Sequence, residues 1–545
     1  MKYFQKILTG FIFLFSLVFS GCKSKIDLAP VDQLDAGTAV FTTPERCLLA
    51  LNGVYDAAQS GTYDPLNGTA SSVRGYPFGA ASIEQGDMRG EDMVNVATFY
   101  QVTYFGTYTT VSPNNVNMWK ELYALINKSN LSISGFRGAG AGGIITATVA
   151  SQYEAECRFL RAMSHHELLL HFARPYADGA GTALGVPYRD FPINNQADVE
   201  YAKTKPRETV AACYTKILAD LDYAETNLPA TQTGAVGIST YRATKAAAIA
   251  LKMRIKLHMG DWAGVITEGN KLIPVAINPQ DFTTVISPVG GWALTKSPDG
   301  PFVDNTSKES IFSIKNDALD NPGTNASLAR MYTISSTATG GRGLCSISPI
   351  VWNLPEWTCT DRRKALLYAN GTDNAGNQNK FTTKYKDALN QSDWTPYIRY
   401  AEVLLTQAEA EARNNASVSQ RAIDLVNTVR NRSIVDSSTN KYTLASFATT
   451  NALINAILKE RRIEFLAEGK RWADIHRLAV DPVFSTGGIP DKMANGFNNL
   501  GAFVCAGPIP APGVPAIVYS DYRFLWPIPQ QERNTNPIID QNPGY

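Results

Sequence analysis

The sequence predicts an all-α dominated fold, in which paired helices carry long irregular loops and a minor amount of β-structure. Apolar residues recur at helical spacing over nine stretches, whereas the segments between them are rich in Gly, Pro, Asn, Thr and aromatic residues. These intervening segments are longer than simple connections. The helical stretches are expected at 44–59, 115–133, 151–172, 209–227, 245–259, 262–273, 397–413, 419–432 and 449–478.

The succession of two-helix units indicates a solenoid-like arrangement. Trp119-x-x-Leu122 and the stretch 220–229 are similar to tetratricopeptide helices. No clean 34-residue period is present, so the repeat is degenerate. We therefore expect tetratricopeptide-like helical pairs without a regular repeat.

Length and composition exclude some classes of protein. By length alone, 545 residues predict two to four domains or one large fold. Lys and Arg number 50 against 49 Asp and Glu, so no basic excess is available for a phosphate backbone, and nucleic-acid binding is not expected. Aromatic residues make up 10% of the chain and charged residues 18%, which is a globular, core-forming composition.

The N-terminus has the pattern of a secretory signal. Lys2 and Lys6 precede an apolar run at 7–19, which is shorter than the roughly 20 residues of a membrane-spanning helix. The following Ser-Gly-Cys22 resembles the lipobox of bacterial lipoproteins, although Phe19 stands where Leu is usual. We expect cleavage of residues 1–21 before Cys22 and a lipid anchor on Cys22. An ordinary secreted protein is the alternative.

The other six cysteines show no metal-binding or redox spacing. Because CxxC and CxxH are absent from the sequence, neither a zinc ribbon nor a thioredoxin-type motif is predicted. Cys157 and Cys213 lie in helical patterns and are expected to be buried thiols. Cys345 and Cys359 flank one loop region, and whether they pair is left open.

Several blocks of sequence recur in one order along nearly the whole chain. They are found at 154–162, 242–248, 256–262, 398–405, 459–465, 468–474 and 525–545. Together with the lipobox, these blocks resemble the SusD/RagB outer-membrane lipoproteins of Bacteroidetes. The resemblance implies a single SusD-like domain over 22–545, with a variable loop region at about 61–110 and 274–394.

The same resemblance implies a function. Such a protein is lipid-anchored in the outer membrane, faces the cell exterior and binds oligosaccharide or polysaccharide. It delivers the glycan to a partner TonB-dependent transporter (SusC-like) for nutrient uptake, without a cofactor and without catalysis. Capture of peptides on the same scaffold is the alternative. Asp27 is the first acidic residue after Cys22, so a periplasmic orientation also stays open.

Arg461, Glu468 and Trp472 are expected to be structural residues of the helix at 449–478. They share one face of this helix with apolar residues at steps of four and seven, namely Ile454, Leu458 and Phe465. A charge on a core-facing stripe costs several kcal/mol unless it is paired. Arg461 is therefore expected to meet an acid of a neighbouring helix, with Glu402 or Glu409 as the leading candidates.

Catalytic and metal-binding motifs are not found. His166 and His171 lie five residues apart, which separates them by about 140° on a helix and does not match a zinc-protease motif. No nucleophile elbow, P-loop or dinucleotide fingerprint occurs. The loop at 373–379 lacks the EF-hand order, so no metal site is predicted, and calcium there is left open. A helical-fold glycoside hydrolase remains an alternative, because folding could bring any two acids about 5–9 Å apart, although the sequence marks no particular pair.

Glycan binding needs exposed aromatic rings interleaved with hydrogen-bonding side chains. The two loop regions have this composition, and the second region also contains Trp394. The predicted ligand-binding residues are Trp352 and Trp357, followed by Trp292, Tyr104, Tyr76 and Asp87.

Overall fold

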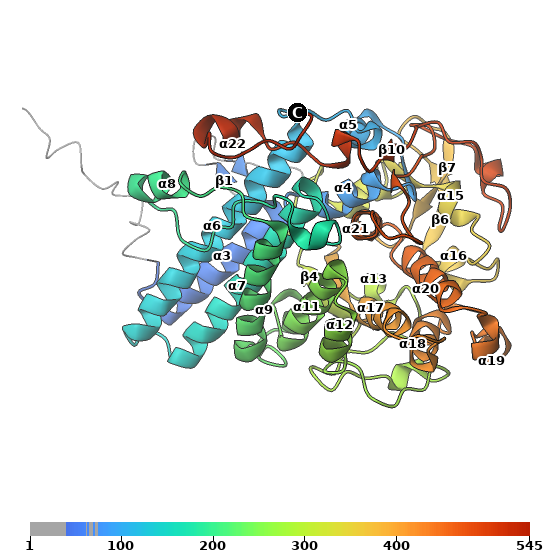
Figure 1. Cartoon of the computed structure of the whole chain (residues 1–545), viewed down its shortest axis with the longest axis horizontal. Helices are drawn as coiled ribbons and strands as arrows, with labels where there is room; N and C mark the ends of the chain where they lie inside the picture. The colour runs from blue at the N-terminus through green and yellow to red at the C-terminus, as the bar shows by residue number, and fades with distance from the viewer. Residues whose placement is uncertain (1–39, 62, 65–68, 71–74) are drawn as a thin grey trace, which may run out of the picture.

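The computed structural model describes residues 40–61, 63–64, 69–70 and 75–545. The predicted signal and Cys22 lie outside these residues. Long helices pack one against the next from left to right in Figure 1, which confirms the helix-dominated, paired arrangement. They are α3 (Pro44–Ser60), α6 (Pro113–Ala141), α7 (Ala147–Phe172), α9 (Val210–Asn227), α11 (Lys245–Met259), α12 (Trp262–Gly269), α17 (Tyr400–Arg413), α18 (Gln420–Arg430) and α20 (Thr450–Glu464).

Side-chain caps explain why many of these helices begin where they do. A Ser or Thr hydroxyl accepts a hydrogen bond from a backbone N–H of the first turn, which is otherwise unsatisfied. The capping residues are Thr43, Thr146, Thr209, Thr244, Ser419 and Thr449. No helix of the described residues is both long and apolar enough to cross a membrane.

The expected single helix at 449–478 is wrong. The chain leaves helical geometry after α20 and re-enters it in α21 (Lys470–Arg477), with φ of +63° at Ala467 and +72° at Gly469. A Cβ on Gly469 would lie 2.6 Å from the Cα of Ile83, so glycine is needed both for the backbone angle and for the close approach of a neighbouring helix.

This break changes the partner of Arg461. The side chain is buried, and its guanidinium lies 3.3 Å from Asp474 of α21 and donates to Thr406 at 3.2 Å. The expectation of Glu402 or Glu409 is wrong, because Glu402 pairs with Arg254 and Glu409 with Arg477. An acid of the same predicted helix reaches Arg461 because the chain turns between α20 and α21.

Short strands tie the intervening segments together. They form antiparallel pairs in the described residues: β1 (Tyr63–Asp64) with β2 (Thr69–Ala70), β3 (Met93–Asn95) with β5 (Cys345–Ile347), β4 (Ser310–Ile314) with β8 (Thr395–Arg399), β6 (Tyr368–Thr372) with β7 (Gln378–Thr382), and β9 (Gly488–Ile489) with β10 (Ile517–Val518). In the pair β3–β5, Met93 lies opposite Ile347, so the two long loop regions are joined through a ladder of backbone hydrogen bonds.

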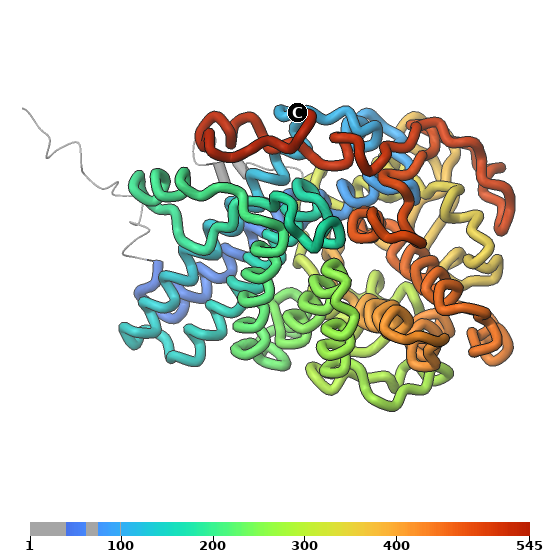
Figure 2. Tube along the Cα trace, in the orientation of Figure 1, coloured from blue at the N-terminus to red at the C-terminus, as the bar shows by residue number. Residues whose placement is uncertain are grey.

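Short helices also lie within or beside these segments. They are α4 (Ala81–Arg89), α5 (Gln101–Phe105), α8 (Gln196–Ala202), α10 (Ile238–Tyr241), α13 (Gly300–Val303), α14 (Leu328–Tyr332), α15 (Pro349–Trp352), α16 (Arg362–Leu366), α19 (Ser437–Asn440) and α22 (Gln530–Thr535). The C-terminal segment, red in Figure 2, runs back across the long helices. Trp526 is fully buried there, and its backbone N–H donates to the carbonyl of His171 at the end of α7.

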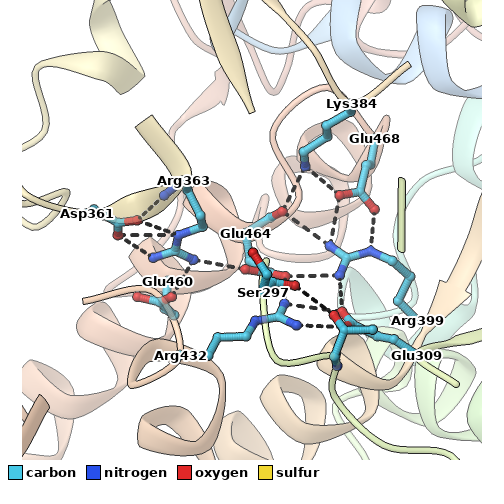
Figure 3. Close-up of polar contacts among 11 residues, drawn as sticks. Ser297, Glu309, Asp361, Arg363, Lys384, Arg399, Arg432, Glu460, Glu464 and Glu468 are labelled. Carbon is cyan, nitrogen blue, oxygen red and sulfur yellow. Dashed lines mark hydrogen bonds and ion pairs between the residues drawn. The ribbon is translucent and has the colours of Figure 1, made fainter. Parts of the chain in front are cut away.

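A network of buried charges joins α20 to the strands β4 and β8 (Figure 3). Glu464 of α20 accepts from Arg399 at 2.9 Å and Arg363 at 2.9 Å, and Arg399 also donates to Glu468 at 2.8 Å. Burial by itself would raise the pKa of Glu464, but Arg432, Arg399 and Arg363 outweigh this effect and hold the pKa well below its usual range. The buried members are the cations Arg363, Lys384, Arg399, Arg430 and Arg432 and the anions Glu309, Asp361, Glu460, Glu464 and Glu468.

Removal of Arg399 is expected to destabilise the fold strongly. The substitution Arg399→Met removes the cation that contacts Glu309, Glu464 and Glu468 and leaves the network with one more anion than cations. Such an uncompensated buried charge costs about 3–5 kcal/mol. Urea unfolding followed by tryptophan fluorescence measures the loss. The control is Lys203→Met, which breaks an exposed pair with Glu200 and is expected to cost less than about 1 kcal/mol. Equal losses in both variants would contradict the role of the network.

Candidate functional site

The predicted ligand-binding side chains are all buried. Their exposed fractions range from 0% for Trp357 to 8% for Trp352, with Trp292, Tyr104, Tyr76 and Asp87 between these values. The expectation that they form an exposed aromatic platform is therefore wrong. Apolar residues of both loop regions pack instead into a second hydrophobic core beside α20. The aromatic composition of these loops reflects their packing against each other.

Trp352 and Trp357 lie in an aromatic cluster with Tyr368. The two indole rings meet edge to face with centroids 5.2 Å apart, and Lys364 lies 4.7 Å from the centroid of the Trp352 ring. Next to this cluster, a disulfide joins Cys359 to Cys505. The possible pairing of Cys345 with Cys359 is thereby excluded. Cys345 is a buried free thiol in β5, as Cys157 and Cys213 are in their helices.

Two of the other predicted residues, Tyr104 and Asp87, hold packed segments together through hydrogen bonds. The hydroxyl of Tyr104 donates to the carbonyl of Met493 at 2.8 Å. Asp87 accepts from the hydroxyl of Tyr332 at 2.9 Å and from the N–H of Gly469 at 3.0 Å. Burial raises the pKa of Asp87 to about 8. These contacts hold α4 against the break between α20 and α21.

The five histidines are also interior residues. His165 is fixed as a neutral ring, since Nδ1 lies 3.0 Å from the carbonyl of Arg161 and Nε2 accepts from the N–H of Arg189. His166 and His171, the pair considered as a metal motif, are buried in α7, and His171 lies 3.2 Å from Glu167. Burial holds the pKa values of His165, His166 and His258 well below the usual range and lowers the pKa of His476 to about 3.

A surface pocket of about 240 Å³ combines aromatic and polar side chains, whereas the predicted residues of the two loop regions are buried. It lies where α3, the short helix α10 and the end of β4 meet. Its wall mixes two tyrosine rings with amide, carboxylate and cationic side chains. The lining residues are Asn52, Tyr55, Asp56, Gln59, Tyr241, Arg242, Ile314, Lys315 and Asp320.

Three partly exposed aromatic rings lie in or beside this pocket. Tyr55 and Tyr241 are both half-buried, and Trp394 packs edge to face on Tyr241 with ring centroids 5.5 Å apart. Of the eight tryptophans, only Trp394 and Trp262 are partly exposed, and the other six are buried. Tyr241 and Trp394 therefore present ring faces or edges of the kind on which a sugar ring can stack.

The polar groups of the pocket are held in place by hydrogen bonds. Gln59 donates to the side-chain oxygen of Asn316 at 2.7 Å, and Asn316 donates to the carbonyl of Asp393 at 2.7 Å, next to Trp394. The hydroxyl of Tyr55 donates to Glu156 at 2.7 Å, and Arg242 donates to the same carboxylate at 2.9 Å. These groups are preorganised, which lowers the entropic cost of ordering them on a ligand.

The charge network positions one wall of this pocket. Glu309, which precedes β4, contacts Arg399 at the end of β8. The pairing of β4 with β8 then brings Ile314 and Lys315 to the pocket, and Thr395, opposite Ile314, brings the adjacent Trp394. The interior ion pairs and the surface site are thus connected through one pair of strands.

Sequence reasoning missed the part of the site that lies on α3. A detectable signal exists, because Asn52, Tyr55, Asp56 and Gln59 follow the spacing of one helical face. Three polar residues and a tyrosine on one face of an otherwise amphipathic helix indicate a function for that face. The helix was expected to be scaffold alone.

Comparison with known proteins agrees with this architecture. A family model described as "SusD family" matches residues 365–545, and a second model, described as "Starch-binding associating with outer membrane", matches residues 66–257. SusD-like protein P2 of Formosa agariphila is 26% identical over 99% of both chains. The chain belongs to the SusD/RagB family.

Solved structures of SusD superfamily proteins share the fold. A SusD superfamily protein from Bacteroides fragilis is 27% identical, with 92% of this chain and 100% of that chain covered and a TM-score of 0.71. A SusD-like carbohydrate binding protein from Bacteroides vulgatus has a TM-score of 0.67 at 18% identity, with 91% and 97% of the two chains covered. The structural likeness to this SusD family extends over more than nine-tenths of the chain.

Truncation of Trp357 is expected to act on stability. Because this indole is fully buried against Trp352 and Tyr368, Trp357→Ala removes about 3–5 kcal/mol from the free energy of unfolding. Trp394→Ala, at a half-buried ring, is expected to cost clearly less. Urea unfolding of both variants makes the comparison, and a loss of less than about 1 kcal/mol in Trp357→Ala would show that the ring is not part of the core.

The buried histidines predict a loss of stability in acid. Folded His476 binds a proton only near pH 3, whereas the unfolded residue does so near 6.5. Between these values the unfolded chain binds more protons, so His476 lowers the free energy of unfolding by about 1.4 kcal/mol for each pH unit of acidification. In His476→Gln, the slope of unfolding free energy against pH should be shallower by this amount between about pH 6 and 5. An unchanged slope would contradict burial of a neutral ring.

Proposed function

We propose that this protein binds oligosaccharide or polysaccharide at the pocket between α3, α10 and β4 without cleaving it. The observation that carries the proposal is the combination of two half-buried tyrosines and Trp394 with the fixed amide of Gln59 and the carboxylates of Asp56 and Asp320. Aromatic rings stack on the apolar faces of sugars, and the polar groups take up hydroxyls. The two tyrosines and the tryptophan supply rings for stacking on a sugar, and the amides supply hydrogen bonds to its hydroxyls.

The family supports the proposed location. One of the two matching family models is described by starch binding and association with the outer membrane. We propose that Cys22 carries a lipid that anchors the chain to the outer membrane, with the binding pocket facing the cell exterior. The bound glycan then passes to a partner TonB-dependent transporter (SusC-like) for nutrient uptake.

Peptide capture differs from this function in the contacts that it requires. An extended peptide adds backbone hydrogen bonds along a free strand edge or a long groove. The pocket is a compact hollow with its aromatic side chains on the rim, and its lining contains a single strand residue, Ile314. The form of the pocket therefore favours a ring-shaped ligand over an extended chain.

Loss of the rim aromatics is expected to weaken binding. In affinity electrophoresis against a panel of plant, fungal and host polysaccharides, Tyr241→Ala and Trp394→Ala should each reduce affinity about tenfold, which corresponds to one lost stacking contact of about 1.4 kcal/mol. Trp262→Ala is the matched control, because this partly exposed tryptophan packs on Arg413 and does not line the pocket.

The outcomes separate the alternatives. Retained glycan binding in both rim variants would move the site elsewhere on the molecule. Binding of a peptide pool and of no polysaccharide would replace the proposal by peptide capture. Release of reducing ends from a polysaccharide that binds would show a hydrolase.

A further inference from the structure

The pocket has an uneven distribution of charge. Each of its two cations forms an ion pair with a carboxylate. Lys315 lies 3.0 Å from Asp317, and Arg242 makes a bidentate salt bridge with Glu156. These pairs leave little positive charge available to a ligand, because each cation is already neutralised at hydrogen-bonding distance.

Asp56 and Asp320 differ from these pairs. Among the residues that the structure describes, neither carboxylate has a Lys, Arg or His nitrogen at ion-pairing distance. Both line the pocket, Asp56 from α3 and Asp320 from the segment after β4. Burial raises the pKa of Asp56, and Asp320 raises it further, while Lys128 opposes the shift. The two carboxylates that line the pocket therefore repel each other electrostatically.

The charged groups that face this site can be counted completely for the described residues. Lys128 acts on Asp56 from α6 without forming a close pair, and its own pKa is lowered by burial. With Lys315 and Arg242 neutralised by their partners, the carboxylates of Asp56 and Asp320 together with the Lys128 ammonium leave a net charge of about one negative at the pocket. A negative field of this kind repels an anion and leaves an uncharged ring unaffected.

We propose that the pocket is a charge filter, in which Asp56 and Asp320 admit neutral or amino sugars and reject uronic-acid and sulfated sugars. This inference rests on the proposed glycan-binding function and specifies the class of ligand. The carboxylates also accept hydrogen bonds from sugar hydroxyls, so the same two residues contribute to the binding of neutral rings. Repulsion through a solvent-filled pocket is weakened by salt.

Matched polysaccharides that differ only in charge test the filter. The probes are hydroxyethyl and carboxymethyl cellulose, desulfated and sulfated carrageenan oligosaccharides, and methyl-esterified pectin and polygalacturonate. For a backbone that binds, the full chain should prefer the neutral member at least tenfold in isothermal titration at low salt. Raising the salt concentration should reduce this preference.

The double variant Asp56→Asn, Asp320→Asn should bring the ratio of the two affinities close to one, mainly by improved binding of the acidic member. The control is Asp491→Asn, which removes an exposed carboxylate that does not line the pocket and should leave the ratio unchanged. A thermal unfolding curve for each variant verifies that it is folded.

Two results would overturn the filter while leaving glycan binding intact. One is equal or tighter binding of the acidic member by the unaltered protein, and the other is a preference that the double variant retains. Failure of every neutral and acidic probe to bind would instead remove the proposed function, and the filter with it.

Discussion

The buried charge network around Glu464 is the constraint on which much of this structure depends. Buried charges are costly unless each is paired with good geometry, so the segments that carry them must come together in one arrangement. Glu309, Arg399 and Glu464 belong to parts of the chain far apart in sequence, yet they contact one another directly or through a shared guanidinium. Their pairing sets β4 against β8 and α20 behind them. The wall of the surface pocket follows from that registration.

The abundance of aromatic residues has two physical origins in this protein. Most of the indole rings fill interior space. Trp352 and Trp357 lie in the second core, Trp472 packs against the C-terminal segment, and Trp526 is a buried residue of that segment. Long loops rich in aromatic residues can therefore have a core of their own, stapled here by the disulfide between Cys359 and Cys505. Of the two partly exposed tryptophans, Trp394 packs on Tyr241 beside the pocket.

The reach of sequence reasoning differs between the scaffold and the site. Apolar spacing placed the long helices, and α11 has the predicted bounds, because helical periodicity is a local property. The break before α21 could not be predicted from periodicity. The apolar spacing continues without change past Ala467, where the backbone is left-handed. For the site, composition pointed to two loop regions, but the pocket takes Tyr55 and Tyr241 from outside both of them, and all six predicted residues are buried. Whether a ring is exposed depends on what packs above it. Composition does not contain that information.

By itself, the sequence determined the helical class, the family and a secretory lipoprotein pattern at the N-terminus, because periodicity and short motifs are properties of neighbouring residues. Only the tertiary structure decided which aromatic rings lie in the core, which acid meets Arg461 and which cysteines pair. It also brought Tyr55 of α3, Tyr241 of α10 and Lys315 after β4 to one pocket. Most of these contacts join residues far apart in the sequence, and they follow from packing and charge pairing between separate segments of the chain.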